Sequence, residues 1–294
     1  MKHKALMVLL LFCCCTYAQK KDSISSKSNL FTFSPSKLLD KGQWDIKWFN
    51  NLYTEIKEAD ENGKKLDRIR QNFFTSSLDV FTGINNSKTI NVGFILEYRS
   101  NTNNGLDAFS VLNFKNNSVE SSRSGITSFA PSIKFSPFKK FRNFTIQSAF
   151  SIPLINKENI GNVYLDQKGY TWQNKFFYDY ISNNETIQLF TEFNTEYNFG
   201  ENNQSFANDS LRVSPGVFIS YFPNQNFTVL GLVQHSNLIA INNNFSQNYT
   251  VIGFGTKYQV TRTTNVEIIY TKFVRGRSSG LGQTFNVGIR TLLD

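Results

Sequence analysis

The stretch that decides the fold is residues 90–99, which read Ile-Asn-Val-Gly-Phe-Ile-Leu-Glu-Tyr-Arg. Large apolar side chains occupy every second position from 90 to 98, so an extended strand places them all on one face. The opposite face carries Asn91, Glu97 and Arg99. One face therefore suits lipid and the other tolerates water and charge, which is the pattern of a membrane-spanning β-strand.

The same alternation recurs along most of the chain. Residues 187–199 place apolar, aromatic or threonine side chains at the odd positions and mainly Gln, Glu or Asn at the even ones, and residues 281–289 alternate in the same way. We predict twelve strands from this pattern. They lie at 43–55, 70–83, 88–100, 124–137, 143–153, 170–181, 185–199, 211–222, 226–236, 247–259, 265–275 and 282–292.

The connections between these strands alternate in length. Short turns are predicted at 84–87, 138–142, 182–184, 223–225 and 260–264, and longer polar connections at 56–69, 101–123, 154–169, 200–210 and 237–246. Outer-membrane barrels have tight periplasmic turns and longer external loops, and an even strand number leaves both termini in the periplasm.

Residues 43–294 are therefore expected to form one all-β domain, a transmembrane antiparallel up-and-down β-barrel of about twelve strands with periplasmic termini. Lipid cannot pair a free sheet edge, so the sheet must close. A soluble secreted β-sandwich is the alternative, because alternation alone also describes a half-buried sheet.

The N-terminus has the pattern of an export signal. Lys2 and Lys4 precede the apolar run 5–12, and Thr16-Tyr17-Ala18 supplies small residues for cleavage after residue 18. The run is shorter than the roughly 20 residues of a spanning helix, which argues against a retained anchor. Bulky Phe12 before Cys13 argues against a lipoprotein. Removal of residues 1–18 takes all three cysteines, so neither disulfides nor a thiolate are expected in the mature chain.

Residues 19–42 are polar and rich in Ser and Lys, and we expect a flexible periplasmic lead there, with a small plug as the alternative. The formal charge falls from +9 to +7 when Lys2 and Lys4 leave with the signal, and no dense basic run remains. Nucleic acid is therefore not an expected partner. The expected partners are outer-membrane lipid, the barrel-assembly machinery and a small solute, although the chain stops at Asp294 rather than on the aromatic residue that this machinery reads.

One motif suggests chemistry: His235-Ser236-Asn237 resembles part of the His-x-Ser-Asn motif of outer-membrane phospholipases and lipid A deacylases. In those families the histidine and serine are two positions apart and share a face. Here they are adjacent, so a regular strand points them to opposite faces. No partner acid is identifiable, and no metal or cofactor spacing is present. We predict no catalytic residue, metal or cofactor, and a lipid hydrolase using His235 is the least favoured function.

Charged side chains on the polar face of the strands are the candidate lumen-lining residues. They are Glu97, Arg99, Lys175, Asp179, Glu192, Glu196, Glu267 and Arg290. Both signs occur, so these groups either pair to fill a narrow lumen or tune which solute passes through a channel.

Three segments carry a family resemblance: Gly-Ile-Thr-Ser-Phe-Ala-Pro-Ser-Ile-Lys-Phe at 125–135, Phe-Ser-Ile-Pro at 150–153 and Gly-Gln-Thr-Phe-Asn-Val-Gly at 282–288. They resemble the transporter-like outer-membrane barrels grouped with the meta-pathway phenol-degradation family, and porin-like proteins more broadly. The resemblance implies a channel or transporter for small, often hydrophobic, compounds in the outer membrane. A structural or interaction barrel with a filled lumen is the alternative.

Overall fold

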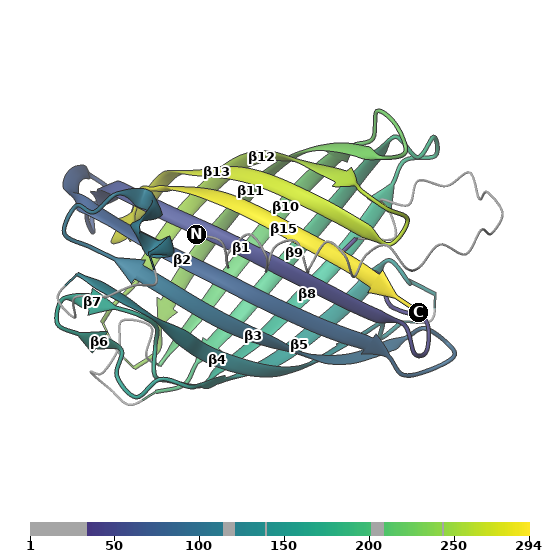
Figure 1. Cartoon of the computed structure of the whole chain (residues 1–294), viewed down its shortest axis with the longest axis horizontal. Helices are drawn as coiled ribbons and strands as arrows, with labels where there is room; N and C mark the ends of the chain where they lie inside the picture. The colour runs from purple at the N-terminus through teal and green to yellow at the C-terminus, as the bar shows by residue number, and fades with distance from the viewer. Residues whose placement is uncertain (1–33, 114–120, 139, 201–208, 243) are drawn as a thin grey trace, which may run out of the picture.

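Twelve antiparallel strands of at least ten residues form the wall of a closed barrel in the computed structural model (Figure 1). The structure describes residues 34–113, 121–138, 140–200, 209–242 and 244–294. The wall strands are β1 (Trp44–Ala59), β2 (Lys65–Gly83), β3 (Ile90–Thr102), β4 (Ser122–Phe135), β5 (Phe144–Pro153), β8 (Thr171–Ile181), β9 (Ile187–Asn198), β10 (Ser210–Tyr221), β11 (Phe227–Ala240), β12 (Gln247–Gln259), β13 (Thr264–Arg277) and β15 (Gln283–Leu293).

The barrel closes because the first strand pairs on both sides. β1 pairs with β2 from Trp44↔Thr82 onward and with β15 from Trp44↔Leu293 to Thr54↔Gln283. Each remaining wall strand pairs with the next along the chain, so the twelve wall strands leave no free edge. The prediction of an all-β, antiparallel twelve-stranded barrel is confirmed.

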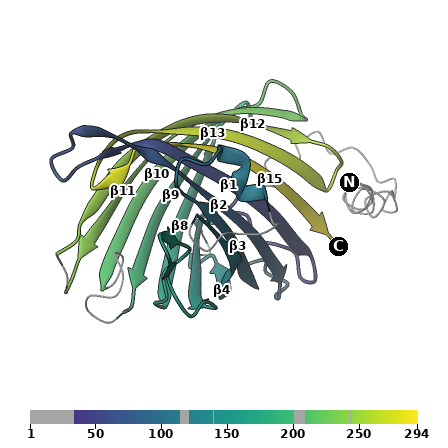
Figure 2. The same ribbon diagram turned by 60° about the vertical axis from the view of Figure 1, so that its left-hand side comes forward.

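Connections of two kinds lie at opposite ends of the barrel. Tight turns at 84–89, 136–143, 182–186, 222–226 and 260–263 gather at one end, here called the short-turn end. The other end, the long-loop end, carries the 3-10 helix η3 (Ala108–Leu112), the two-residue strands β6 (Asn159–Ile160) and β7 (Val163–Tyr164), and β14 (Ser279–Gly280), which pairs with β1. Figure 2 turns this end toward the viewer.

Two of the predicted long connections are shorter than expected. At 56–69, β1 and β2 continue as a paired hairpin to the connection 60–64, and at 237–246, β11 continues to Ala240. In the first case Arg68 bridges Glu55 and Glu58, each at 2.9 Å. Charged side chains gave this segment the composition of a loop, but cross-strand pairs hold it in a ladder.

The wall buries polar side chains on its inner face and exposes apolar side chains on its outer face, the reverse of a soluble protein. In β15, Thr284, Asn286 and Arg290 are buried, whereas Phe285 and Val287 are exposed. Large apolar side chains on the outside of the other strands are exposed too, including Phe254 at 65%. A soluble sandwich would bury this face, because exposed apolar area costs about 25 cal/mol per Å² in water. The polar interior therefore opposes the sandwich alternative. The described residues contain no helix that is both long and apolar enough to cross a membrane.

Candidate functional site in the barrel lumen

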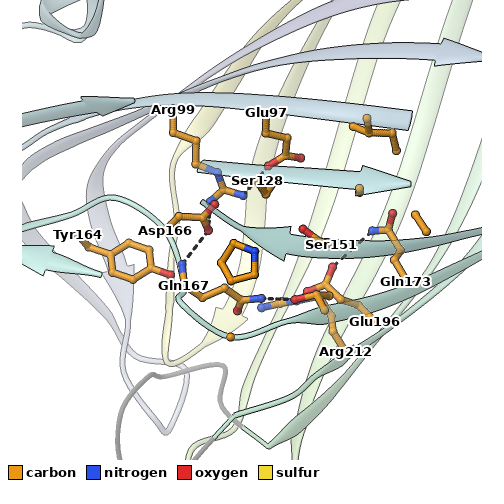
Figure 3. A pocket seen from close by; sticks show the side chains of 16 residues that line it. Glu97, Arg99, Ser128, Ser151, Tyr164, Asp166, Gln167, Gln173, Glu196 and Arg212 are labelled. Atoms are coloured by element: carbon orange, nitrogen blue, oxygen red, sulfur yellow. Dashed lines mark hydrogen bonds and ion pairs between the residues drawn. The ribbon is translucent and has the colours of Figure 1, made fainter. Parts of the chain in front are cut away.

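A polar pocket lies inside the barrel at the long-loop end, with a volume of ≈ 300 Å³ (Figure 3). Its charged lining comes from four segments that are distant in sequence. These lining residues are Glu97, Arg99, Asp166, Glu196 and Arg212. The wall strands supply four of the five, and the connection between β7 and β8 supplies Asp166. Closure of the barrel thus brings both charge signs together around one space.

Arg99 organises one side of this pocket. Its guanidinium contacts Asp166 at 3.0 Å and Glu97 at 3.1 Å. Two positions along β3, Asn101 Nδ2 donates to the carbonyl oxygens of Tyr164 and Leu165 at 2.8 and 3.0 Å. Side chains of β3 therefore hold the segment that carries Asp166 inside the mouth of the barrel.

Arg212 organises the other side. Its Nε lies 3.7 Å from Glu196, which is its cross-strand partner, and one of its terminal nitrogens donates to Ser236 Oγ at 3.2 Å. Gln173 Nε2 also lies within 3.5 Å of Glu196. Each guanidinium thus has a carboxylate partner, and the pocket offers paired charges and amides rather than a single strong field.

Asp166 lies outside the spanning strands, and burial raises the pKa of its carboxyl above the ordinary aspartate value. The positive charge of Arg99 and the backbone N–H of Gln167, which donates at 2.8 Å, act in the opposite direction. Burial is the larger effect. The Asp166–Arg99 ion pair is therefore open to protonation at a higher pH than a solvated aspartate would allow.

A second cavity of ≈ 820 Å³, the aromatic vestibule, lies beside the polar pocket. Tyr53, Phe73, Tyr249 and Phe273 line it from β1, β2, β12 and β13. Ring centroids lie 4.9 Å apart for Tyr53–Phe273 and for Tyr249–Phe273. Arg99 and Tyr164 line both cavities, so the two spaces share a boundary. Charged side chains, among them Glu55, Glu58 and Arg68, also line the vestibule, so the long-loop end offers an aromatic surface edged by charge directly next to the polar pocket.

Ion pairs occupy the short-turn half of the lumen. Glu267 accepts from Lys47 at 3.0 Å and from Lys257 at 3.2 Å. Arg290 contacts both carboxylate oxygens of Asp45, at 2.6 and 2.8 Å, and joins the last wall strand to the first. These side chains are polar groups of the interior face, and each of the two carboxylates has a cationic partner.

The start of the described chain also lies in the short-turn half. Ser34 Oγ donates to Asp179 at 2.9 Å, and Gln188 Nε2 donates to the same carboxylate at 2.7 Å. Lys134 Nζ donates to the carbonyl oxygen of Pro35 at 3.0 Å, and Leu39 is buried. Residues 34–39 of the predicted 19–42 lead thus contact the interior of the wall, while residues 19–33 and the predicted signal 1–18 lie outside the described residues.

Six of the eight residues predicted to line the lumen fall into two groups. Glu97, Arg99 and Glu196 line the polar pocket, whereas Asp179, Glu267 and Arg290 belong to the short-turn half. Lys175 lies in register with Asn194 on β9, and Glu192 lies in register with Gly216 on β10, between these groups.

Sequence reasoning missed several partners in the lumen: Asp45, Lys47, Lys134, Asp166, Arg212 and Lys257. Five of these six lie at inward positions of strands, so a stricter use of the two-residue period would have found them. Asp166 lies in a connection, where no period applies.

His235 and Ser236 do not form a catalytic pair. His235 is exposed on the outer face of β11, where its Nδ1 lies 3.0 Å from Thr250 Oγ1. Ser236 is buried on the inner face and accepts from Ser214 at 2.9 Å. The structure therefore places the two side chains on opposite faces. In the described part of the chain, no three His, Cys, Asp or Glu side chains gather as metal ligands would.

A scan against protein-family models and a search of curated proteins each found no match to this sequence. Among solved structures, the COG4313 outer membrane channel from Pseudomonas putida F1 is similar at a TM-score of 0.66 and 10% identity, covering 92% of this chain and 100% of that one. The beta domain of the Bordetella autotransporter BrkA is similar at 0.53 and 9% identity, covering 84% and 98%. This likeness confirms the barrel architecture that the sequence resemblance implied.

Proposed function

We propose that this protein is an outer-membrane channel for small solutes that carry an apolar part. The observation that carries the proposal is the pairing of an aromatic vestibule with a polar pocket at one mouth of a closed barrel whose outer face is apolar. Likeness in fold to a solved outer membrane channel supports the location. The export signal predicted at residues 1–18 supports the same compartment.

The vestibule suits a solute with a flat or aliphatic body. Tyr53, Phe73, Tyr249 and Phe273 present ring faces and edges that bind apolar groups without demanding one hydrogen-bond pattern. Beyond Arg99 and Tyr164, the same solute would meet carboxylates, guanidiniums and amides that can bind one polar substituent. This order of surfaces favours phenol-like or similar amphipathic compounds over sugars and salts.

Uptake into proteoliposomes tests this proposal. The purified barrel should admit a small phenol faster than a sugar of similar mass. Phe273→Ala should reduce phenol entry several-fold, because it removes the ring that contacts both Tyr53 and Tyr249 and so takes away apolar surface that would bind the phenol. Phe254→Ala is the matched control, since Phe254 is a phenylalanine on the outer face of the neighbouring strand. Equal uptake of the phenol by the Phe273→Ala variant and the parent protein would contradict the vestibule's role.

A structural barrel with a filled lumen is a second candidate, favoured by the ion pairs and by residues 34–39 in the short-turn half. Ion conductance in planar bilayers separates the two functions. A channel should show discrete openings, and Glu196→Gln should change their ion selectivity, since Glu196 lines the pocket. Absence of both conductance and solute uptake would favour the structural role.

A further inference from the structure

Four basic side chains cluster on the outer face of the barrel near the long-loop end. Lys272, Arg275 and Arg277 lie on β13 and His235 lies on β11, and all four are exposed. The register joins them through β12, where Ile252 is opposite Lys272 and Thr250 is opposite both His235 and Arg275. These four residues are here called the exterior basic patch.

A β-bulge turns two members of this patch, Arg275 and Arg277, outward. The register between β12 and β13 shifts at Thr250/Val251, so that Val251 is opposite Phe273 while Thr250 is opposite Arg275. One extra residue, Val274, is thereby inserted into β13. Without it, strict alternation from Phe273 would point Arg275 into the vestibule. The bulge therefore places Arg275 and Arg277 on the outside with Lys272, while Phe273, which precedes it, stays inside.

On β13, the patch begins where the run of exposed apolar side chains ends. Tyr270 lies two positions before Lys272 on β13, and its ring packs against Phe254 and Phe285 at centroid distances of 5.5 and 5.4 Å. Phe254 is 65% exposed and Phe285 48%. Lys272 and Arg275 follow two and four ladder steps further along, about 7 and 13 Å at about 3.3 Å per residue, since the bulged Val274 does not advance the ladder. The exposed charges thus follow the last aromatic side chain on the outer face of β13, which is the order expected at the edge of a barrel's apolar band.

The patch has no acidic partner in the described part of the chain. None of the ion pairs among the described residues includes Lys272, Arg275 or Arg277. The neighbouring outer positions hold Asn248 and Gln283, which are uncharged hydrogen-bonding groups. Inside the lumen, by contrast, the arginines and several lysines contact carboxylates. The outer cations can therefore bind a negatively charged ligand without first breaking an ion pair within the protein.

We propose that the exterior basic patch binds the phosphate groups of an anionic lipid in the leaflet that surrounds the long-loop end, with a phosphorylated glycolipid as the ligand class. The proposal rests on the proposed function, because it requires the barrel to reside in a bilayer. Guanidinium groups bind phosphate oxygens through two parallel N–H bonds, and the Lys272 ammonium adds a point charge. The alkyl stems of these side chains can lie along the apolar wall while their charged ends reach the headgroup.

Binding of lipid A to the purified full barrel in neutral detergent tests the assignment. The variant Lys272→Gln/Arg275→Gln should bind about 25-fold more weakly, since each cation near an anionic lipid surface contributes about fivefold. Lys140→Gln/Arg142→Gln is the matched control. It removes one lysine and one arginine charge from an exposed turn at the short-turn end, far from the patch, and should bind like the parent protein. Added salt should weaken the parent more than the patch variant.

Three results would overturn the proposal. One is lipid A binding by the patch variant within twofold of the parent, and another is an equal loss in the short-turn control, which would show a response to net charge alone. The third is displacement of lipid A by excess inorganic phosphate, which would show a site for a soluble anion. Heat-modifiable mobility and insertion into phosphatidylcholine vesicles are measured on all three proteins. Failure of the parent to insert refutes both proposals, whereas insertion and conductance with unchanged lipid binding refutes only the patch.

Discussion

The seam between the first and last strands depends on the Asp45–Arg290 ion pair. Arg290 contacts both carboxylate oxygens of Asp45, and the two side chains are only 8% and 9% exposed. Arg290→Gln would leave Asp45 buried without this partner. Removing one member of a buried pair typically costs about 3–5 kcal/mol, and solvent screens little of the penalty here. We expect Arg290→Gln to lower the free energy of unfolding by about that amount.

Urea titration of the barrel folded in micelles measures this change, with Trp44 and Trp48 on β1 as fluorescent reporters next to the seam. The double variant Asp45→Asn/Arg290→Gln carries no buried charge at this position and should recover at least about 2 kcal/mol of the loss. A cost below about 1 kcal/mol for Arg290→Gln would refute the reasoning, as would a double variant no more stable than the single one.

Three further predictions concern the pocket, the ion pairs and the outer wall. Because burial raises the pKa of Asp166, acidification should protonate its carboxyl and break the ion pair with Arg99 at a pH above the ordinary pKa of aspartate. Single-channel noise should then rise as pH falls, and Asp166→Asn should remove this pH dependence. The protonated form of this carboxyl stabilises the fold. Its contribution to the free energy of unfolding is therefore greatest below the ordinary aspartate pKa and is lost as pH rises through the raised pKa. Glu267→Gln would leave Lys47 and Lys257 without their shared carboxylate, so the reversal potential in a salt gradient should shift toward anions, whereas an unchanged potential would place this cluster off the ion path. Asn72 is fully buried on the outer wall and donates to Thr102 Oγ1 and to the carbonyl oxygens of Leu106 and Asp107. Asn72→Ala should therefore cost about 1–3 kcal/mol and speed proteolysis within 103–113, whereas unchanged cleavage would show that other contacts hold this segment.

The architecture was predictable because alternation is a local property. A strand such as residues 90–99 shows in ten residues which side chains share a face, and the short and long connections between strands indicate an up-and-down order. Two boundaries were missed for a local reason as well. The ends of β1 and β2 extend into a charged hairpin whose side chains have the composition of a loop.

The sequence by itself determined that this protein builds a closed sheet with one apolar and one polar face, and it identified the side chains Glu97, Arg99, Glu196, Glu267 and Arg290 as a set. Only the tertiary structure decided which partners these charges meet. Arg99 binds Asp166 from a connection, Arg290 binds Asp45 across the seam, and Ser34 reaches Asp179 from outside the strands. The physical reason is that the face of a residue follows from its two neighbours in the chain. Its partner across a lumen depends instead on strand stagger, bulges and closure, which here join residues 67 to 245 positions apart.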